Sequence, residues 1–265
     1  MRGITRDSLV EFIDRKVIWV FAALLLLGIL IVLLTGKLNM GLKLPISDNA
    51  DLEGLDALIR DPFMRVFNGF LGIFLFLAVM ASAGLFPRML ERGRIDFYLS
   101  KPISRVGLLL NKFLGLWTVY GGAVVASGLV LFVAIGLVHG TFYLAAVYLV
   151  LLSLASIFVW LTITTFFGIL SGSTAMSIMA AFLFWVAQQV LEARQVLKSL
   201  LDSDLADAVL DAVYYILPKT NAMSDAFYAL ALGRPVGDWV PVWSTLLFAV
   251  VLLYLSALVM RRKDF

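Results

Sequence analysis

Six apolar stretches, each free of Asp, Glu, Lys and Arg, alternate with polar segments along this 265-residue chain. Each stretch reaches the length of about 17–25 residues that a helix needs to cross roughly 30 Å of hydrocarbon. The stretches cover 17–34, 66–86, 113–138, 142–170, 171–191 and 240–260. The pattern therefore predicts an all-α, polytopic membrane protein in which one transmembrane domain, residues 1–265, contains six transmembrane helices.

Two boundaries in this pattern need an argument. Residues 17–34 follow Arg15 and Lys16, as the apolar part of a signal peptide would. The run is longer than such a segment and no small-residue cleavage site follows it, so we expect an uncleaved first span. Residues 168–174 (GILSGST) divide one long apolar stretch into the fourth and fifth spans. Gly168 and Gly172 there permit close contact between helices.

The distribution of charge predicts the orientation. The flanks that would share a side with both termini hold thirteen basic and six acidic residues, and the opposite flanks hold eight basic and twelve acidic residues. Cytoplasmic flanks of membrane proteins carry the excess of Lys and Arg. We therefore expect a multi-pass protein of the inner (cytoplasmic) membrane with both termini in the cytoplasm, which an even number of spans also requires.

The first segment, 1–16, has helical periodicity. Leu9, Val10 and Ile13 fall near one helical face, and Glu11 lies largely on the opposite face. This pattern predicts an amphipathic helix at the cytoplasmic surface of the bilayer. An ordinary lead-in to the first span is the alternative.

The segment 192–239 is predicted to form amphipathic helices on the outer side. Apolar pairs recur about every four residues over 196–217, with four aspartates between them. This spacing is typical of one amphipathic helix that ends before Pro218, and a second short helix is expected at 223–232. Neither is long and apolar enough to span, so both are expected at the outer leaflet. Four apolar positions of the helix predicted over 196–217 would form an outer gate: Leu200, Leu201, Val209 and Val213.

Little else in the sequence indicates chemistry. There is no cysteine, and His139, the single histidine, falls in a short outer turn, so we expect no catalytic and no metal site. The acidic segment 35–62 lacks the spacing of a calcium loop. Without a GxxxxGK[ST] loop the chain is not expected to hydrolyse ATP or to bind a cofactor itself. The formal charge of +3 gives no reason to expect nucleic acid as a partner.

The loop 87–112 carries the most ordered pattern. Residues 86–115 read FPRMLERGRIDFYLSKPISRVGLLLNKFLG. This stretch resembles the region after the second span in ABC transporter permeases of the six-span exporter class, and the C-terminal RRKDF is also similar. Within the class, the chain resembles the compact permeases that include the one serving nitrous oxide reductase maturation. The residues that carry the resemblance are Glu91, Arg92, Gly93, Leu99, Ser100, Pro102, Ser104, Arg105 and Lys112.

The resemblance implies a permease subunit that moves or extracts a substrate with ATP hydrolysed elsewhere. ATP and Mg would lie on a separate ABC ATPase subunit, present in two copies, and the permease would pair with a second copy of itself. Loop 87–112 would be the coupling helix that contacts the ATPase. The implied coupling residues are Glu91, Arg92, Gly93, Arg94, Asp96, Pro102, Ser104 and Arg105.

Other interpretations of the same residues stay open. A basic loop between two spans can be a simple positive-inside anchor rather than a coupling element. The whole chain can be a non-transporting membrane subunit that transmits ATPase motion to an outer-side or periplasmic protein. An ion-coupled carrier is disfavoured, because such carriers place ionisable groups inside their spans.

Overall fold

The computed structural model describes residues 2–14, 16–39, 52–91, 93, 103–140, 142–201 and 204–263, and in these ranges it contains helices and no strand. Six helical stretches in these ranges are long and apolar enough to cross a membrane. This confirms the expectation of an all-helical chain with six candidate spans. The six stretches are Val17–Leu34, Arg60–Met89, Arg105–Val138, Leu144–Ser171, Thr174–Glu192 and Val240–Arg262.

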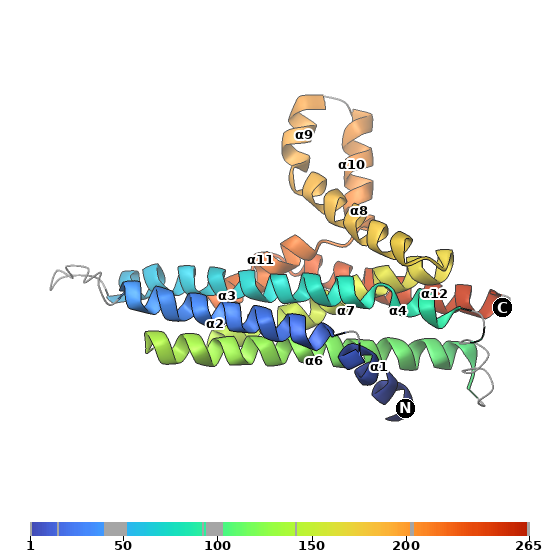
Figure 1. Ribbon diagram of the computed structural model, residues 1–265. Coiled ribbons are helices and arrows are strands. Elements are labelled where there is room, and N and C mark those ends of the chain that lie inside the picture. Colours follow the sequence, from blue (N-terminus) through green and yellow to red (C-terminus); the bar gives the residue numbers. More distant parts are fainter. Residues whose placement is uncertain are drawn as a thin grey trace.

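The helices pack into an elongated bundle, with the start of α1 and the end of α12 toward the same end (Figure 1). Several continue past the apolar stretches, so Arg60, Asp61 and Arg65 lie in α3 and Lys112 lies in α6. All four charges lie within the first eight residues of the membrane-length stretches Arg60–Met89 and Arg105–Val138. The elements are α1 (Arg2–Asp14), α2 (Val17–Asn39), α3 (Leu52–Ser82), α4 (Leu85–Met89), α6 (Arg105–His139), the 3-10 turn η1 (Leu144–Ala146), α7 (Val147–Ser171), α8 (Thr174–Glu192), α9 (Arg194–Leu201), α10 (Asp204–Ile216), α11 (Thr220–Ala231) and α12 (Val240–Arg262).

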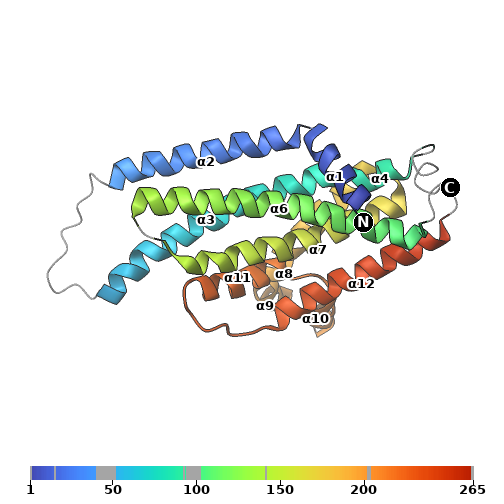
Figure 2. The same ribbon diagram turned by 90° about the horizontal axis from the view of Figure 1, so that it is seen from below.

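Helix α7 is the centre of the bundle and packs against α3, α6, α8, α11 and α12 (Figure 2). Three of its buried hydroxyl groups donate to carbonyls of the same helix. The Ser153 and Thr162 hydroxyls lie 2.7 Å from the carbonyl oxygens of Val150 and Phe158, and the Thr164 hydroxyl lies 3.0 Å from that of Leu161. These polar groups are therefore satisfied without a partner on another helix.

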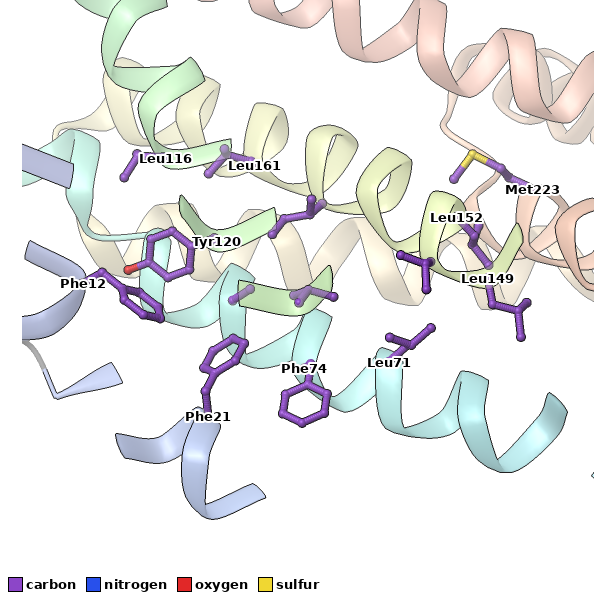
Figure 3. Close-up of a cluster of buried hydrophobic side chains, with 14 of the residues drawn as sticks. Phe12, Phe21, Leu71, Phe74, Leu116, Tyr120, Leu149, Leu152, Leu161 and Met223 are labelled. Atoms are coloured by element: carbon purple, nitrogen blue, oxygen red, sulfur yellow. The ribbon is translucent and has the colours of Figure 1, made fainter. Parts of the chain in front are cut away.

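Aromatic side chains join α1 and α2 to the rest of the bundle (Figure 3). The ring of Phe12 lies 5.1 Å from that of Tyr120 in α6 and 5.9 Å from that of Phe21 in α2. Phe21 in turn stacks on Phe74 of α3 at 5.5 Å. These four buried rings supply large apolar area in favourable edge and stacked geometries. Helix α1 can lie across α6 because the chain bends at Lys16, whose φ is 58°.

The fourth and fifth spans separate at a glycine turn. Gly172 has a φ of 67° and its N–H donates to the Gly168 carbonyl at 2.9 Å, which ends α7. A left-handed residue after the last helical turn is a common helix end, and glycine adopts it without strain. Helix α8 then begins at Thr174. Both ends fall inside 168–174, where the sequence analysis places the boundary.

The single helix expected over 196–217 is wrong. The structure has two helices there, α9 and α10, which form a hairpin standing away from the bundle (Figure 1). Lys198 and Asp211 form an ion pair at 2.7 Å across the hairpin. Thirteen residues of continuous helix would separate them by about 20 Å, so this pair requires the reversal. The periodicity of both halves is similar, which is why the pattern alone reads as one helix.

Candidate functional site

The bundle end that contains α1, α4 and the last turn of α12, here called the α4 end, holds the predicted coupling residues that the structure describes (Figure 1). Those are Glu91, Gly93, Ser104 and Arg105. The other predicted coupling residues lie outside the described residues. They are Arg92, Arg94, Asp96 and Pro102.

Helix α4 leads directly into the predicted coupling loop, 87–112, and packs against the junction of α7 and α8. Pro87 is buried, and a Cβ added at Gly168 would lie 3.1 Å from its Cδ and 2.7 Å from Ser177 Oγ. A Cβ at Gly84 would similarly lie 3.0 Å from Thr174. Both contacts are closer than ordinary van der Waals distance, so a larger side chain at either glycine would require its neighbours to shift.

The described loop residues after α4 are exposed. Glu91 lies at the surface, and Gly93 has a φ of 85°, which glycine tolerates far better than other residues. At the far side of the loop, Ser104 caps α6 by accepting a hydrogen bond from the Gly107 N–H at 3.0 Å. Such a cap contributes about 1 kcal/mol to the start of a helix.

Two hydrogen bonds tie three helices together at the α4 end. Arg105 Nη1 in α6 donates to the carbonyl of Lys263 at 2.5 Å, just after α12. Lys263 Nζ donates to the carbonyl of Ile169 in α7, also at 2.5 Å. Both acceptors are carbonyl groups near helix C-termini, where positive charge is favoured. Arg105 thus supports the packing of α6 and α12, whatever else it contacts.

A buried ion pair fixes α1 to α6. Lys112 Nζ lies 2.6 Å from Glu11 Oε2, and their side chains are 1% and 24% exposed. A lysine ammonium at that burial is unfavourable without a paired carboxylate. Leu9, Val10 and Ile13 of the same helix are exposed instead. Helix α1 therefore meets the bundle through Ser8, Glu11 and Phe12 and leaves apolar residues uncovered.

At the opposite end of the bundle, α11 is anchored to α3. Arg60 Nη2 donates to the Ala231 carbonyl at 2.6 Å. The Tyr228 hydroxyl contacts the carbonyl and the carboxylate of Asp61 at 3.0 and 3.1 Å. Burial, and next this hydrogen bond, raise the pKa of Tyr228 to about 12. The hydroxyl therefore keeps its proton and stays a donor at neutral pH.

The predicted outer gate falls on the α9–α10 hairpin. Val209 and Val213 are 52% and 37% exposed in α10, so neither is covered by the bundle of the same chain. Leu200 and Leu201 belong to α9, but their side chains lie outside the described residues. The adjoining face of α8 is also uncovered. Its side chains Phe182, Leu183 and Trp185 are 58%, 61% and 50% exposed.

Comparison with known families decides the class of protein. The family described as ABC-2 family transporter protein matches residues 4–265, nearly the whole chain. The chain belongs to the ABC-2 transporter family. Searches of curated proteins and of solved structures find no match.

Membership identifies this ABC-2 protein as the permease component of an ABC transporter, a multi-pass membrane subunit distinct from the ATPase. It also implies an ABC ATPase as a partner. Among the described residues no three His, Cys, Asp or Glu side chains gather where a metal ion could bind.

Three contacts of this ABC-2 permease were not predicted from its sequence. The sequence pattern placed Glu11 largely on the face opposite the apolar residues, yet Glu11 pairs with buried Lys112. It did not anticipate that Pro87 packs against Gly168, although the Gly168 and Gly172 spacing did indicate a close approach. It also gave no role to Arg105 beyond the loop. Each contact joins residues distant in sequence, so no local pattern could have predicted it.

Proposed function

We propose that this ABC-2 permease is an exporter subunit that works as a pair of copies with two ATPase subunits. In this proposal the α4 end faces the cytoplasm, as the excess of basic residues in its flanks favours. The ATPases contact the loop around residues 88–104. Their closure on ATP tilts helices and moves or extracts a substrate along a path between the two permease copies.

The contact between α4 and the α7–α8 junction carries the proposal. A force on the loop reaches Pro87 within a few residues, and Pro87 is packed without slack against Gly168. Close-packed interiors shift as units rather than deform. Movement of α4 would therefore be passed to α7, the central helix, and to α8. Glu91 and Arg92 are proposed to make the polar contacts with the ATPase, and Gly93 to allow a close approach.

Pairing of two copies is proposed through α8 and the α9–α10 hairpin. Both present apolar side chains that the single chain leaves uncovered. The hairpin of each copy would then lie over the path, with Leu200, Leu201, Val209 and Val213 as an outer gate. Helix α1 is proposed to rest its uncovered apolar residues in the cytoplasmic interface of the bilayer.

The test of coupling is the double variant Glu91→Ala with Arg92→Ala, reconstituted with its ATPase. Glu91 is exposed, so we expect normal expression and an unchanged unfolding temperature. Charged groups that become desolvated at an interface contribute about 2–5 kcal/mol, so ATPase binding or stimulation should fall at least tenfold. The matched control is Arg234→Ala with Asp238→Ala, an exposed base and acid outside this loop. Full stimulation in the Glu91 and Arg92 double variant would reduce the loop to a topological anchor.

The second candidate is a non-transporting subunit that pulls on an outer-side partner. The α9–α10 hairpin favours this function, because it projects from the bundle and could bind such a partner (Figure 1). A transport assay with the complete complex separates the two functions. ATP turnover without movement of any cargo, lost when the hairpin is deleted, would support the second. The sequence likeness to the compact permeases of nitrous oxide reductase maturation is compatible with either.

A further inference from the structure

The base of the α9–α10 hairpin forms a cavity of about 290 Å³ that is partly open to the outside. Its wall comes from the end of α8, the start of α9, the end of α10 and the start of α11. This volume holds several water molecules, so it has room for a small polar group. The polar residues of the wall are Gln188, Glu192, Arg194, Tyr214, Lys219 and Asn221.

Two cations share one aromatic ring in this wall. The guanidinium of Arg194 lies 3.5 Å from the centroid of the Tyr214 ring, and Lys219 Nζ lies 4.6 Å from the same centroid. Lys219 is only 5% exposed. Its Nζ donates to Ser244 Oγ at 3.2 Å, which uses one of its three ammonium protons. Against these two cations, Glu192 is the one carboxylate among the lining residues.

The electrostatic environment of Lys219 is unfavourable in the absence of an anion. Burial, and next the charge of Arg194, lower the pKa of Lys219. A negative group bound between the two side chains would oppose both effects.

Gln188 adds an unused donor to the same wall. It is 3% exposed, and its Oε1 accepts hydrogen bonds from the backbone N–H and the hydroxyl of Thr220. A backbone N–H can only donate, so the atom facing Thr220 must be the oxygen of the amide. The amide nitrogen, Nε2, is buried and has no hydrogen-bond partner among the described residues. Buried donors of this kind are rare in native structures unless a ligand or water accepts from them.

We propose that this cavity binds a phosphate-type oxyanion, held by Arg194, Lys219 and the Nε2 of Gln188. Two cations and one amide donor match the several acceptor oxygens and the negative charge of such a group. The group belongs either to the head of an anionic phospholipid or to free phosphate. The site goes beyond the proposed coupling function, and it stands whether or not the loop transmits ATPase motion.

The experiment titrates the purified full chain, in uncharged detergent, with three probes: inorganic phosphate, short-chain phosphatidylglycerol and short-chain phosphatidylcholine. The shift of the thermal unfolding midpoint with probe concentration gives a dissociation constant. We expect phosphate or phosphatidylglycerol to bind at least tenfold more tightly than phosphatidylcholine, whose choline brings a cation toward Lys219 and Arg194. Tighter binding of phosphatidylglycerol than of phosphate identifies a lipid head group, and the reverse order identifies a free anion.

Two variants and one control decide whether the cavity is responsible. Gln188→Glu keeps the acceptor for Thr220 and puts a carboxylate where the amide donor was, so binding should weaken at least tenfold. Lys219→Gln should also weaken it and keeps the backbone hydrogen bond from Lys219 to Thr245 Oγ1 at 2.8 Å. It carries the test if Gln188→Glu does not fold. Arg234→Gln, at an exposed cation outside the wall, is the control and should bind as the parent does.

No saturable binding of either anionic probe to the parent protein would overturn the proposal. Equal weakening in Arg234→Gln and in the cavity variants would also overturn it, because binding would then follow overall charge rather than the cavity.

Discussion

The α4 end and the α9–α10 hairpin are both rich in charge and flanked by apolar helices, yet they relate to the bundle in opposite ways. At the α4 end, a buried ion pair, two hydrogen bonds and two glycine contacts join α1, α4, α6, α7, α8 and α12. The hairpin has an ion pair whose partners are both partly exposed, and apolar residues that its own chain does not cover.

The difference indicates which surfaces are covered by residues of the same chain and which are not. The polar contacts at the α4 end have partners within the chain, and the apolar residues left exposed there are those of α1: Leu9, Val10 and Ile13. Helix α10 leaves Leu205 and Val209 uncovered, as α8 leaves Phe182 and Leu183. Apolar area of that kind is stable only against lipid or another protein.

The largest effect is expected from Glu11→Ala. It leaves the ammonium of Lys112 buried without its carboxylate, and breaking such a pair costs about 3–5 kcal/mol. The low end applies because Glu11 keeps 24% exposure. Chemical denaturation in detergent measures the loss. The double variant Glu11→Leu with Lys112→Met should recover most of it, and failure to recover would mean that the pair does not hold α1 in place.

The next effect is expected from Gly168→Val. The new side chain would collide with Pro87 and Ser177, and overpacking of this kind costs about 1–3 kcal/mol. Because the collision pushes α4 away, we expect Gly168→Val to lower ATPase stimulation even under conditions in which the permease stays folded. Gly122→Val is the matched control, since a Cβ there has no neighbour within 4 Å. Equal losses of ATPase stimulation in the two variants would remove the special role of the α4 contact.

A smaller effect, of a different kind, is expected from Val209→Asp in the hairpin. Val209 is 52% exposed, so the stability of a single subunit should change by no more than about 0.5 kcal/mol. If a second copy covers the hairpin, burying the new charge should weaken self-association at least tenfold, or about 1.4 kcal/mol. Sedimentation in detergent measures the amounts of the single subunit and of the self-associated pair. A large loss of subunit stability would show instead that this face packs on its own bundle.

The smallest effect is expected from Asp211→Asn. Its partner Lys198 is 27% exposed and Asp211 is 47% exposed, and ion pairs in water contribute about 0–1 kcal/mol. The hairpin should therefore persist, with Arg194 still stacked on Tyr214. Hydrogen exchange of α9 and α10 is the measurement. Collapse of protection throughout both helices would place the ion pair among the main determinants of the hairpin.

Six spans and the all-helical class could be predicted because bilayer thickness imposes one length and one composition on each crossing. The turn at 168–174 could be predicted because glycine marks it locally. The division of 196–217 into α9 and α10 could not be predicted, because both halves have the same four-residue periodicity. The contact that reveals the reversal, between Lys198 and Asp211, forms only once the hairpin has folded.

The site divides along the same line. Ser104 and Gly93 have local roles, a helix cap and a left-handed turn, but from the sequence they were named only through the resemblance, as coupling residues. Gln188, Arg194 and Lys219 were not named as site residues, because their proposed role depends on α8, α9, α10 and α11 meeting at the base of the hairpin. The coupling roles of all eight residues rest on the resemblance and stay predictions: Glu91, Arg92, Gly93, Arg94, Asp96, Pro102, Ser104 and Arg105.

The self-contained hydrogen bonds of α7 bear on how the protein is built into the bilayer. Three buried hydroxyls of α7 already donate to carbonyls of the same helix, so these groups need no neighbouring helix when α7 enters lipid, whereas the buried Thr165 hydroxyl has no hydrogen-bond partner among the described residues. During synthesis α7 follows α3 and α6, its neighbours on one side, and precedes α8, α11 and α12, its neighbours on the other. It can therefore dock on the first group at once and then serve as the template on which the second group assembles. Errors in α7 should accordingly block insertion of the later helices while leaving the earlier ones in place.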